Sequence, residues 1–401
     1  MAAVEPRARL VAFAEDVFDA FERPSQRLCG ELYVRGLIEQ GPRKSLQPTL
    51  VRLGESGARY ESMQQFVADS PWSAGELVRR VAERVAPRLE VTCWVVDDTG
   101  FPKDGRRSPG VKRQYSGTLG KIGNCQIGVS LHAVGERGTL PLGWSLYLPE
   151  DWCADSERRR RAKIPGDVRF RTKAQLAAAL IGEAIGWEIP RGPILADQAY
   201  GDDAAFRIGL EQERLSYVVA ISARTTVYDA ETEFSVPARA GSVGRPTSVV
   251  RADREPAAVA ALAAALPSEA FETLAFGERP TGVQRHGRFA CVRVFAVGEI
   301  RRQCRAPRSE WLIIEWPDQA DEPTDYWLSN LPLGTAPVEL VRLARLRWTI
   351  ELDYRQLKGE LGLDHYEGRS WAGWHHHTAL VTCAHAFLTE ERLDPKAQRP
   401  A

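Results

Sequence analysis

The sequence lacks the features of membrane-spanning proteins, of secreted proteins and of proteins with a structural zinc site. In its 401 residues no apolar run reaches the roughly 18 residues of a membrane-spanning helix, and the start, MAAVEPRARL, lacks the charged-then-apolar order of a secretory signal. The seven cysteines form no C-x-x-C pair and follow no regular spacing, which argues against a disulfide framework and a structural zinc site. We therefore expect a cytoplasmic protein without membrane contact, whose cysteines are reduced thiols.

Net charge is lacking as well. The 53 basic residues balance 53 acidic ones, so the overall charge does not indicate a polyanionic partner. Residues 101–173 depart from this balance, with 15 Lys and Arg against 7 Asp and Glu, including the run from Arg158 to Arg161. Such a stripe is typical of a nucleic-acid contact or of a solvated arginine-rich loop, and both interpretations stay open. Only 8 of the 53 basic residues are lysine, a skew that a GC-rich coding genome explains equally well.

The spacing of apolar residues predicts an all-helical N-terminal domain over residues 1–88. ARLVAFAEDVFDAF and AGELVRRVAERV both place apolar residues at helical intervals, and Ser70 or Ser73 is the expected N-cap of the second segment. The domain could serve packing or the recognition of DNA ends, and the sequence does not separate these roles.

The next region, residues 89–224, is predicted to be α/β. Strands are expected in VTCWVV, CQIGVSLHAV, LPLGWSLYLP, PILA and SYVVAIS, with a helix over 172–187. A right-handed crossover can lay the fourth strand, which ends on Asp197, beside the first. Residues 225–330 are predicted to be a β-rich insertion with one helix in EPAAVAALAAAL, and residues 331–401 to be closing helices.

Among those closing helices, VELVRLARLRWTIELDYRQLKGELG predicts one helix of about seven turns. Its spacing places Arg347, Glu351, Arg355 and Lys358 on one face, so that a single carboxylate lies between cations.

Acidic residues on three separate elements are the candidates for chemistry. In CWVVDDTGF, Asp97 and Asp98 point to opposite faces of a strand, so only one of them can face a given site. Asp97, Asp197 and Glu351 together would suit two Mg²⁺ ions, which prefer oxygen ligands, acting on a phosphodiester. Taken singly, the same residues are equally typical of a turn, a short-strand end and a surface ion pair.

Longer stretches resemble a known family. DDTGFPKDGRRSPGVKRQYSGTLGKIGNCQIGVSLHAV, LYLPEDW, ILADQAYGDD and RWTIELDYRQLKGELGLDHYEGRSWAGWHHHTALVTCAHAFL are similar to the three catalytic blocks of bacterial insertion-sequence transposases of the DDE class, over residues 60–388. The resemblance implies an RNase H-like mixed sheet with helices, interrupted by a β-rich insertion. The family's third block, Tyr-x2-Arg-x3-Glu-x6-Lys, falls on Ala344, Arg347, Glu351 and Lys358, so the tyrosine is missing.

The resemblance also implies the site. The first block, Asp-x-Thr, falls on Asp97 and Thr99, which leaves Asp98 to cap a turn or support the site from behind. Two Mg²⁺ ions, with Mn²⁺ as a substitute, are expected at the three acids Asp97, Asp197 and Glu351. Contacts to DNA are expected from Lys112, Arg113, Tyr115, Arg347, Arg355, Lys358 and Trp327. The pattern around Trp327 favours a core residue, and the resemblance adds the hypothesis that it stacks on a flipped base.

The implied function is that of a transposase that binds the terminal inverted repeats of its element, cleaves them and joins 3′-hydroxyls to target DNA. A homodimer on paired ends is expected, associated with the nucleoid when bound to DNA. A transposase-derived DNA-binding protein without catalysis and a paired-carboxylate glycoside hydrolase are the alternatives. The histidines His375, His376, His377 and His385 could suggest a metal, but consecutive histidines diverge around a helix, which favours packing.

Overall fold

The computed structural model describes residues 5–55, 57–236, 250–278, 282–297 and 308–394. It divides the chain into two compact units, one formed by Met1–Arg191 with Thr349–Ala401 and the other by Gly192–Trp348. This division differs from the four predicted ranges, because the strand that precedes Asp197 is grouped with the inserted segment. The two units are described in turn.

The first unit begins with five helices, as the apolar spacing predicts. They are α1 (Pro6–Val17), α2 (Pro24–Ile38), α3 (Leu46–Arg52), α4 (Gly57–Ala68) and α5 (Ala74–Val85), with short 3₁₀ turns η1 (Phe18–Ala20) and η2 (Ala86–Arg88). Ser73 is the N-cap of α5, where its hydroxyl accepts a hydrogen bond from the backbone NH of Glu76 at 3.1 Å. One of the two predicted caps is thereby confirmed.

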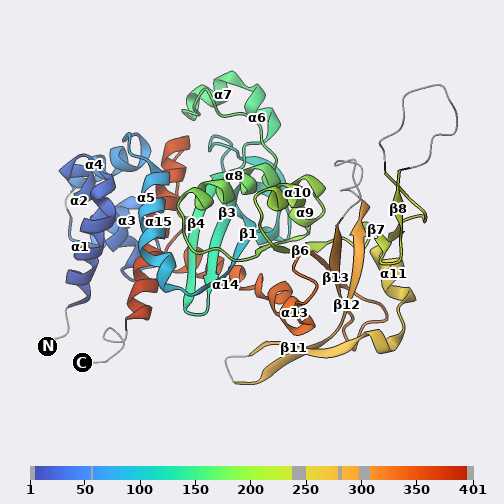
Figure 1. Cartoon of the computed structure of the whole chain (residues 1–401). Helices are drawn as coiled ribbons and strands as arrows, with labels where there is room; N and C mark the ends of the chain where they lie inside the picture. The colour runs from blue at the N-terminus through green and yellow to red at the C-terminus, as the bar shows by residue number, and fades with distance from the viewer. Residues whose placement is uncertain (1–4, 56, 237–249, 279–281, 298–307, 395–401) are drawn as a thin grey trace. The chain divides into compact units, whose positions relative to one another are not determined.

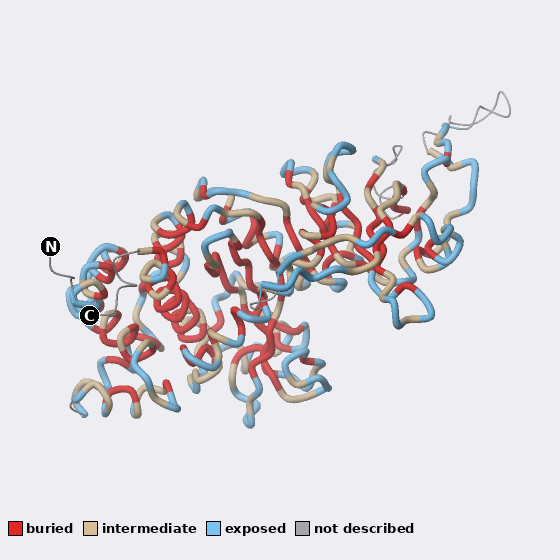
Figure 2. The backbone as a smooth tube through the Cα atoms, turned by 90° about the horizontal axis from the view of Figure 1, so that it is seen from below, coloured by how far each residue is buried: buried red, intermediate tan, exposed pale blue. Residues whose placement is uncertain are grey.

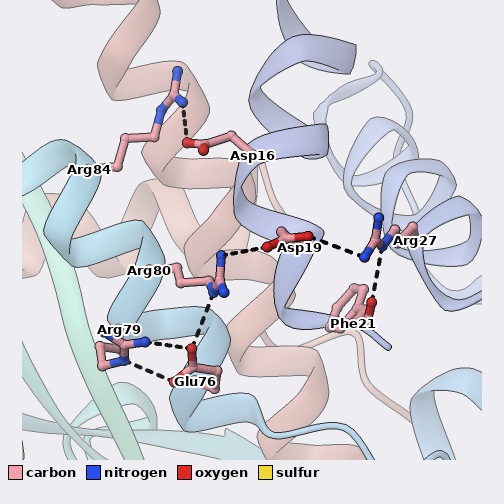
Figure 3. Close-up of polar contacts among 8 residues, drawn as sticks. All are labelled: Asp16, Asp19, Phe21, Arg27, Glu76, Arg79, Arg80 and Arg84. Atoms are coloured by element: carbon pink, nitrogen blue, oxygen red, sulfur yellow. Dashed lines mark hydrogen bonds and ion pairs between the residues drawn. The ribbon is translucent and has the colours of Figure 1, made fainter. Parts of the chain in front are cut away.

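Arginines on α5 and α2 tie the helices together. Arg80 lies between Asp19 and Glu76, and Arg27 reaches both Asp19 and the carbonyl of Phe21 (Figure 3). These pairs are largely exposed, and exposed pairs contribute little each, so they fix the orientation of the helices more than they stabilise the fold.

The long C-terminal helix α15 (Trp371–Leu393) forms the centre of this helical layer (Figure 1). It packs against α2, α4, α5 and β4, and most of its residues are buried. Figure 2 shows how buried and exposed residues are distributed along the chain. The predicted N-terminal helices therefore share a core with α15, and α15 also packs against β4.

Those strands are β1 (Val91–Pro102), β2 (Lys112–Ser116), β3 (Lys121–Gly135) and β4 (Gly138–Leu146), with η3 (Gly117–Leu119) between β2 and β3. The long β3 is central, because it pairs antiparallel with β1 along one edge and with β2 and β4 along the other. The remaining helices of the unit are α6 (Glu150–Ala154), α7 (Ser156–Arg161), α8 (Lys173–Gly186) and α14 (Thr349–Gly359).

The second unit is a mixed sheet with a few helices. Its strand order is β10-β7-β12-β13-β14-β6-β5, with β11 paired to β12, and β5 and β6 are parallel. The strands are β5 (Ile194–Ala196), β6 (Tyr217–Ile221), β7 (Thr226–Asp229), β10 (Ala257–Ala258), β11 (Glu272–Glu278), β12 (Gln284–Ala296), β13 (Ser309–Glu315) and β14 (Asp325–Ser329). A separate ribbon is formed by β8 (Phe234–Ser235) and β9 (Arg251–Ala252).

The helices of this unit are α9 (Gln198–Gly201), α10 (Ala204–Gln212), α11 (Val259–Ala265) and α13 (Pro337–Leu346), with a 3₁₀ turn η4 (Ser268–Ala270). The strands and the helix predicted within the inserted segment are confirmed.

The single helix predicted for the closing segment is wrong. Helix α13 ends at Leu346, the amide of Trp348 bonds the carbonyl of Arg345 in a tight turn, and α14 starts at Thr349. The sequence Trp348-Thr349-Ile350 explains the interruption, because aromatic and β-branched residues are weaker helix formers than the leucines and arginines around them. The break separates Arg347 from Glu351, so the predicted four-residue face does not form on one helix.

No helix among the described residues is long and apolar enough to cross a membrane. Cys29, Cys93, Cys125, Cys153, Cys291 and Cys383 are free thiols, as predicted, and Cys304 lies outside the described residues.

Candidate active site

Strand β1 carries Asp97 in its interior. Asp97 is opposite Ser130 of β3, and the pairing continues through Pro102 opposite Cys125. The interpretation of Asp-Asp-Thr-Gly as a turn is therefore wrong, because the ladder holds these residues extended. The side chain of Asp97 is buried, and its Oδ1 accepts a hydrogen bond from the backbone NH of Asp98 at 2.7 Å.

Asp98 points to the other face, as alternation along a strand requires. Its Oδ2 lies 2.8 Å from Nζ of Lys173, the first residue of α8. Since Asp98 lies within a strand, the expectation that it caps a turn is wrong. It forms an ion pair that fastens the start of α8 to the sheet.

Helix α14 is docked on the Asp97 face by buried polar contacts. Oδ2 of Asp353 lies 3.0 Å from Nδ1 of His132, and its Oδ1 accepts a hydrogen bond from Thr139 at 2.7 Å. The Tyr354 hydroxyl lies 2.7 Å from the hydroxyl of Ser130. His132 and Ser130 stand opposite Val95 and Asp97, so both anchors belong to the face that carries Asp97.

This docking brings carboxylates around one hydroxyl group. The pKa of Tyr354 is raised well above its ordinary value by burial, and further by the nearby carboxylates of Asp97, Asp98 and Glu351. Glu351 itself is exposed on the first turn of α14. Asp97 and Glu351, 254 positions apart in the sequence, thus both act electrostatically on the same hydroxyl group.

Lys358, the next-to-last residue of α14, reaches back to β1. Its Nζ donates to Oγ1 of Thr99 at 2.8 Å, to the carbonyl of Gly100 at 2.7 Å and to Oγ1 of Thr118 at 3.1 Å. Burial lowers the pKa of Lys358 to about 8, against the opposing influence of Asp364 and Glu351. Lys358 of the third block is therefore in direct contact with Thr99 of the first.

The second unit contains Asp197, which directly follows β5 as predicted. It is half-buried and caps the short helix α9, where its Oδ1 accepts a hydrogen bond from the NH of Ala199 at 3.0 Å. Carboxylate oxygens are the ligands that Mg²⁺ prefers, so the residue types at all three positions fit this ion. Within the described ranges, no three histidine, cysteine, aspartate or glutamate side chains are gathered closely enough to form a metal site.

The predicted DNA contacts differ in their surroundings. Lys112, Arg113 and Tyr115 are exposed on β2, and Nζ of Lys112 lies 3.1 Å from Oδ1 of Asp151. Arg355 is exposed on α14, whereas Arg347 is half-buried at the end of α13.

Trp327 is different. It lies within β14, is only 6% exposed, and the guanidinium of Arg345 lies 5.4 Å from its ring centre. A flipped base needs an open ring face to stack on, which this side chain does not offer. The expectation that Trp327 stacks on a base is wrong, because the tryptophan belongs to the core of its unit.

The histidines of α15 are packing residues. His376 lies 2.8 Å from the carbonyl of Val67 and 2.9 Å from that of Trp72, and His377 lies 2.8 Å from the Tyr33 hydroxyl. Burial lowers the pKa of His377 to about 4, so the ring is neutral near pH 7. These histidines hold α15 against the N-terminal helices, in agreement with the interpretation that favoured packing over a metal.

A cleft of about 670 Å³ opens elsewhere in the first unit, between the N-terminal helices and the loop that precedes α15. Its cationic lining residues are Arg43, Arg161, Lys163 and Arg369, and its aromatic ones are Tyr33, Tyr60 and Tyr366. Glu367 pairs with Arg43, and Asp69 pairs with Lys163. Cations therefore outnumber acids in this cleft, which could not be foreseen because its lining comes from five separate segments of the sequence.

Comparison with known proteins identifies the family. The family model described as DDE superfamily endonuclease matches residues 16–281, more than half of the chain. The chain belongs to the DDE superfamily of endonucleases. The α/β fold with its N-terminal helices is accordingly RNase H-like, as predicted. The match includes Asp97 and Asp197, while Glu351 lies beyond it.

One curated relative of this DDE chain is the probable transposase for insertion sequence element IS701 of Microchaete diplosiphon. The two are 30% identical over 164 residues, which is 40% of this chain and 40% of the relative. The match thus spans less than half the length of the relative.

Several residues of the site were not foreseen from the sequence. They are Ser130, His132, Asp353 and Tyr354, which dock α14, together with Thr118 and Lys173, which contact the two faces of β1. A partial signal was present in ELDYRQLK, because Asp353 lies on the side of the helix opposite the exposed Glu351 and Arg355. Their partners on β3 carried no such signal.

Proposed function

We propose that this protein is a transposase that cleaves DNA at the ends of its own element and joins the freed 3′-hydroxyls to target DNA. The observation that carries the proposal is the docking of α14, through Tyr354 on Ser130 and Asp353 on His132, against the face of the sheet that carries Asp97. Two carboxylates from distant parts of the sequence on one face of a sheet are what metal-dependent phosphodiester chemistry requires.

In this proposal Asp97, Asp197 and Glu351 hold two Mg²⁺ ions, for which Mn²⁺ can substitute. Bound there, the metal activates the attacking oxygen and stabilises the leaving oxygen of the phosphodiester. Water is the nucleophile in cleavage, and the 3′-hydroxyl of the element is the nucleophile in joining. The protein's own residues bind the DNA backbone and orient the carboxylates, with Tyr354 and Asp353 fixing the helix that carries Glu351.

The DNA backbone is held by the cations around this face. Lys358 reaches Thr99, two residues from Asp97, so a phosphate bound by its ammonium group lies next to the acids. Arg355, Arg347 and the β2 cations Lys112 and Arg113 extend the contact along the backbone. Such contacts position the duplex without reading its sequence.

The terminal inverted repeats are read by the N-terminal helical layer. The cleft that it forms with the loop before α15 supports this assignment, because its cations outnumber its acids and a local excess of positive charge attracts polyanions. A homodimer is proposed, since two ends have to be cut together.

The test is cleavage of DNA that carries the flanking ends of the element. The intact protein is compared with Asp197→Ala in Mg²⁺, and with itself in EDTA. We expect cleavage by the intact protein alone, and Asp203→Ala, another helix-capping aspartate of the same unit, serves as the matched control that retains it. Cleavage by Asp197→Ala at the rate of the intact protein would contradict the assignment of this acid.

Two other functions remain as outcomes of the same experiment. End-specific binding without cleavage by any version would indicate a transposase-derived DNA-binding protein. Activity on glycosides that survives EDTA would indicate a paired-carboxylate hydrolase, since such enzymes need no metal.

A further inference from the structure

The ribbon formed by β2 and β3 displays an apolar pair to solvent. Tyr115 is 65% exposed and Ile122 is 59% exposed, and the two are direct cross-strand partners. Single exposed apolar residues are common on proteins, but an aromatic and a β-branched residue that face each other across two strands normally lie inside a sheet. Here they form the projecting face of a hairpin.

Cations surround this pair. Arg113 shares the face of Tyr115, because it lies two residues earlier on the same strand, and it is exposed. Lys121, next to Ile122, and Lys112 start from the other face of the ribbon and are exposed as well, and Lys112 pairs with Asp151. An apolar centre with a basic rim matches a partner that combines flat apolar groups with negative charge, which is the chemistry of stacked bases between phosphates.

The hairpin is fastened to the candidate active site. Oγ1 of Thr118, in the turn η3, accepts hydrogen bonds from the NH of Gly100 at 3.2 Å and from Nζ of Lys358 at 3.1 Å. A Cβ atom at Gly100 would lie 2.0 Å from Oγ of Ser116, so the close approach of hairpin and β1 requires glycine at this position. Tyr115 is therefore held at a fixed separation from Thr99 and Asp97.

We propose that Tyr115 and Ile122 form a wedge that inserts between base pairs of the DNA beside the phosphodiester to be cleaved and holds them unstacked. Arg113 and Lys121 bind the phosphates on either side. Apolar side chains that enter a base step open and kink the duplex, which exposes the backbone at that step. The proposal rests on the proposed function, because it places this DNA next to Asp97.

The test uses the full-length protein and duplexes with 2-aminopurine beside the cleavage site, whose fluorescence rises when the base is unstacked. We expect a rise with the intact protein and with Tyr115→Phe, which keeps the ring. Tyr115→Ser and Ile122→Ser should lose most of the rise and bind about 10-fold more weakly. Leu333→Ser, at a residue before α13 that is 72% exposed, is the matched control and should behave as the intact protein.

A second substrate makes the test specific. A duplex with a mismatch at the cleavage step is already unstacked, so it should restore binding and cleavage by Tyr115→Ser to within about twofold of the intact protein. A full fluorescence rise with Tyr115→Ser would overturn the wedge. So would a change in oligomeric state of Tyr115→Ser without any change in fluorescence, because the pair would then be a protein interface.

The outcomes also separate the wedge from the proposed function. Unstacking that depends on Tyr115 in a protein that never cleaves would overturn the transposase chemistry and support the wedge. Cleavage by the intact protein without unstacking would overturn the wedge and support the transposase chemistry. If the intact protein unstacks neither the element's ends nor unrelated duplexes and does not cleave, both are overturned.

Discussion

The replacement Tyr354→Phe tests whether the docking of α14 places Glu351. It removes a single oxygen atom, which lies 2.7 Å from the hydroxyl of Ser130 in a buried site. The aromatic ring stays, so the packing against His132 and Trp144 is preserved. What is lost is the hydrogen bond between α14 and β3, and the Ser130 hydroxyl is left buried without that partner.

The magnitude follows from this loss. Leaving a buried hydroxyl unsatisfied costs about 1–3 kcal/mol of unfolding free energy, and Ser130→Ala should cost a similar amount. Because the two changes remove the same hydrogen bond, the double variant should be less destabilised than their sum, by about 0.5–1.5 kcal/mol. Mutation of a residue that holds a metal ligand in place typically lowers metal affinity by about 10- to 100-fold. We therefore expect the Mg²⁺ concentration for half-maximal cleavage to rise at least about 10-fold.

The assays are urea unfolding followed by tryptophan fluorescence, and cleavage rates over a Mg²⁺ titration at saturating DNA. Tyr147→Phe, at a half-buried tyrosine of the same unit, is the control that should alter neither quantity. Additive stability losses would show that Tyr354 and Ser130 do not interact. Unchanged Mg²⁺ dependence of Tyr354→Phe, despite lower stability, would refute the argument that the docking of α14 positions Glu351.

Three further outcomes can be checked. Asp98→Asn should lower the free energy of unfolding by about 1 kcal/mol through loss of the ion pair with Lys173, but it should retain cleavage. Asp97→Ala should abolish cleavage. Equal losses of cleavage in the two variants would contradict the placement of these acids on opposite faces of β1. Binding to DNA should weaken as the pH rises through about 8, where Lys358 loses its proton, and this dependence should be absent from Lys358→Arg in fluorescence anisotropy. Trp327→Phe should reduce the free energy of unfolding by about 1–3 kcal/mol and leave the affinity for element ends unchanged. A weaker affinity of a variant that is folded to the same extent would show that Trp327 contacts DNA.

The sequence predicted best what local pattern determines. The strand around Asp97, the strand before Asp197 and the cap at Ser73 follow from apolar runs and side-chain chemistry within a few residues. The family resemblance then selected the acids from among many carboxylates. The end of an element was harder to predict than its presence. The first strand was predicted to end at the aspartates, whereas β1 continues to Pro102.

What escaped prediction depends on pairing between distant segments. Asp-Asp-Thr-Gly favours a turn by local chemistry, yet the ladder with β3 holds it extended. Asp353 looked like one more charge on a solvated helix, and only the fold shows that His132 lies within reach of it. Trp327 is an aromatic residue of the kind that stacks on bases, but its burial is decided by the sheet around it.

The continuation of β1 past Asp97 has a chemical consequence. Because the strand stays extended, successive side chains are forced to opposite faces, and each acid meets a different helix. Asp98 is held by Lys173 on α8, whereas Asp97 lies on the face that Tyr354 and Asp353 of α14 contact. A turn at this point would have let both carboxylates approach the same site, where their mutual repulsion would raise the pKa of one of them. The strand thus allows two adjacent aspartates to serve separately, one in the proposed chemistry and one in fastening the sheet to its helix.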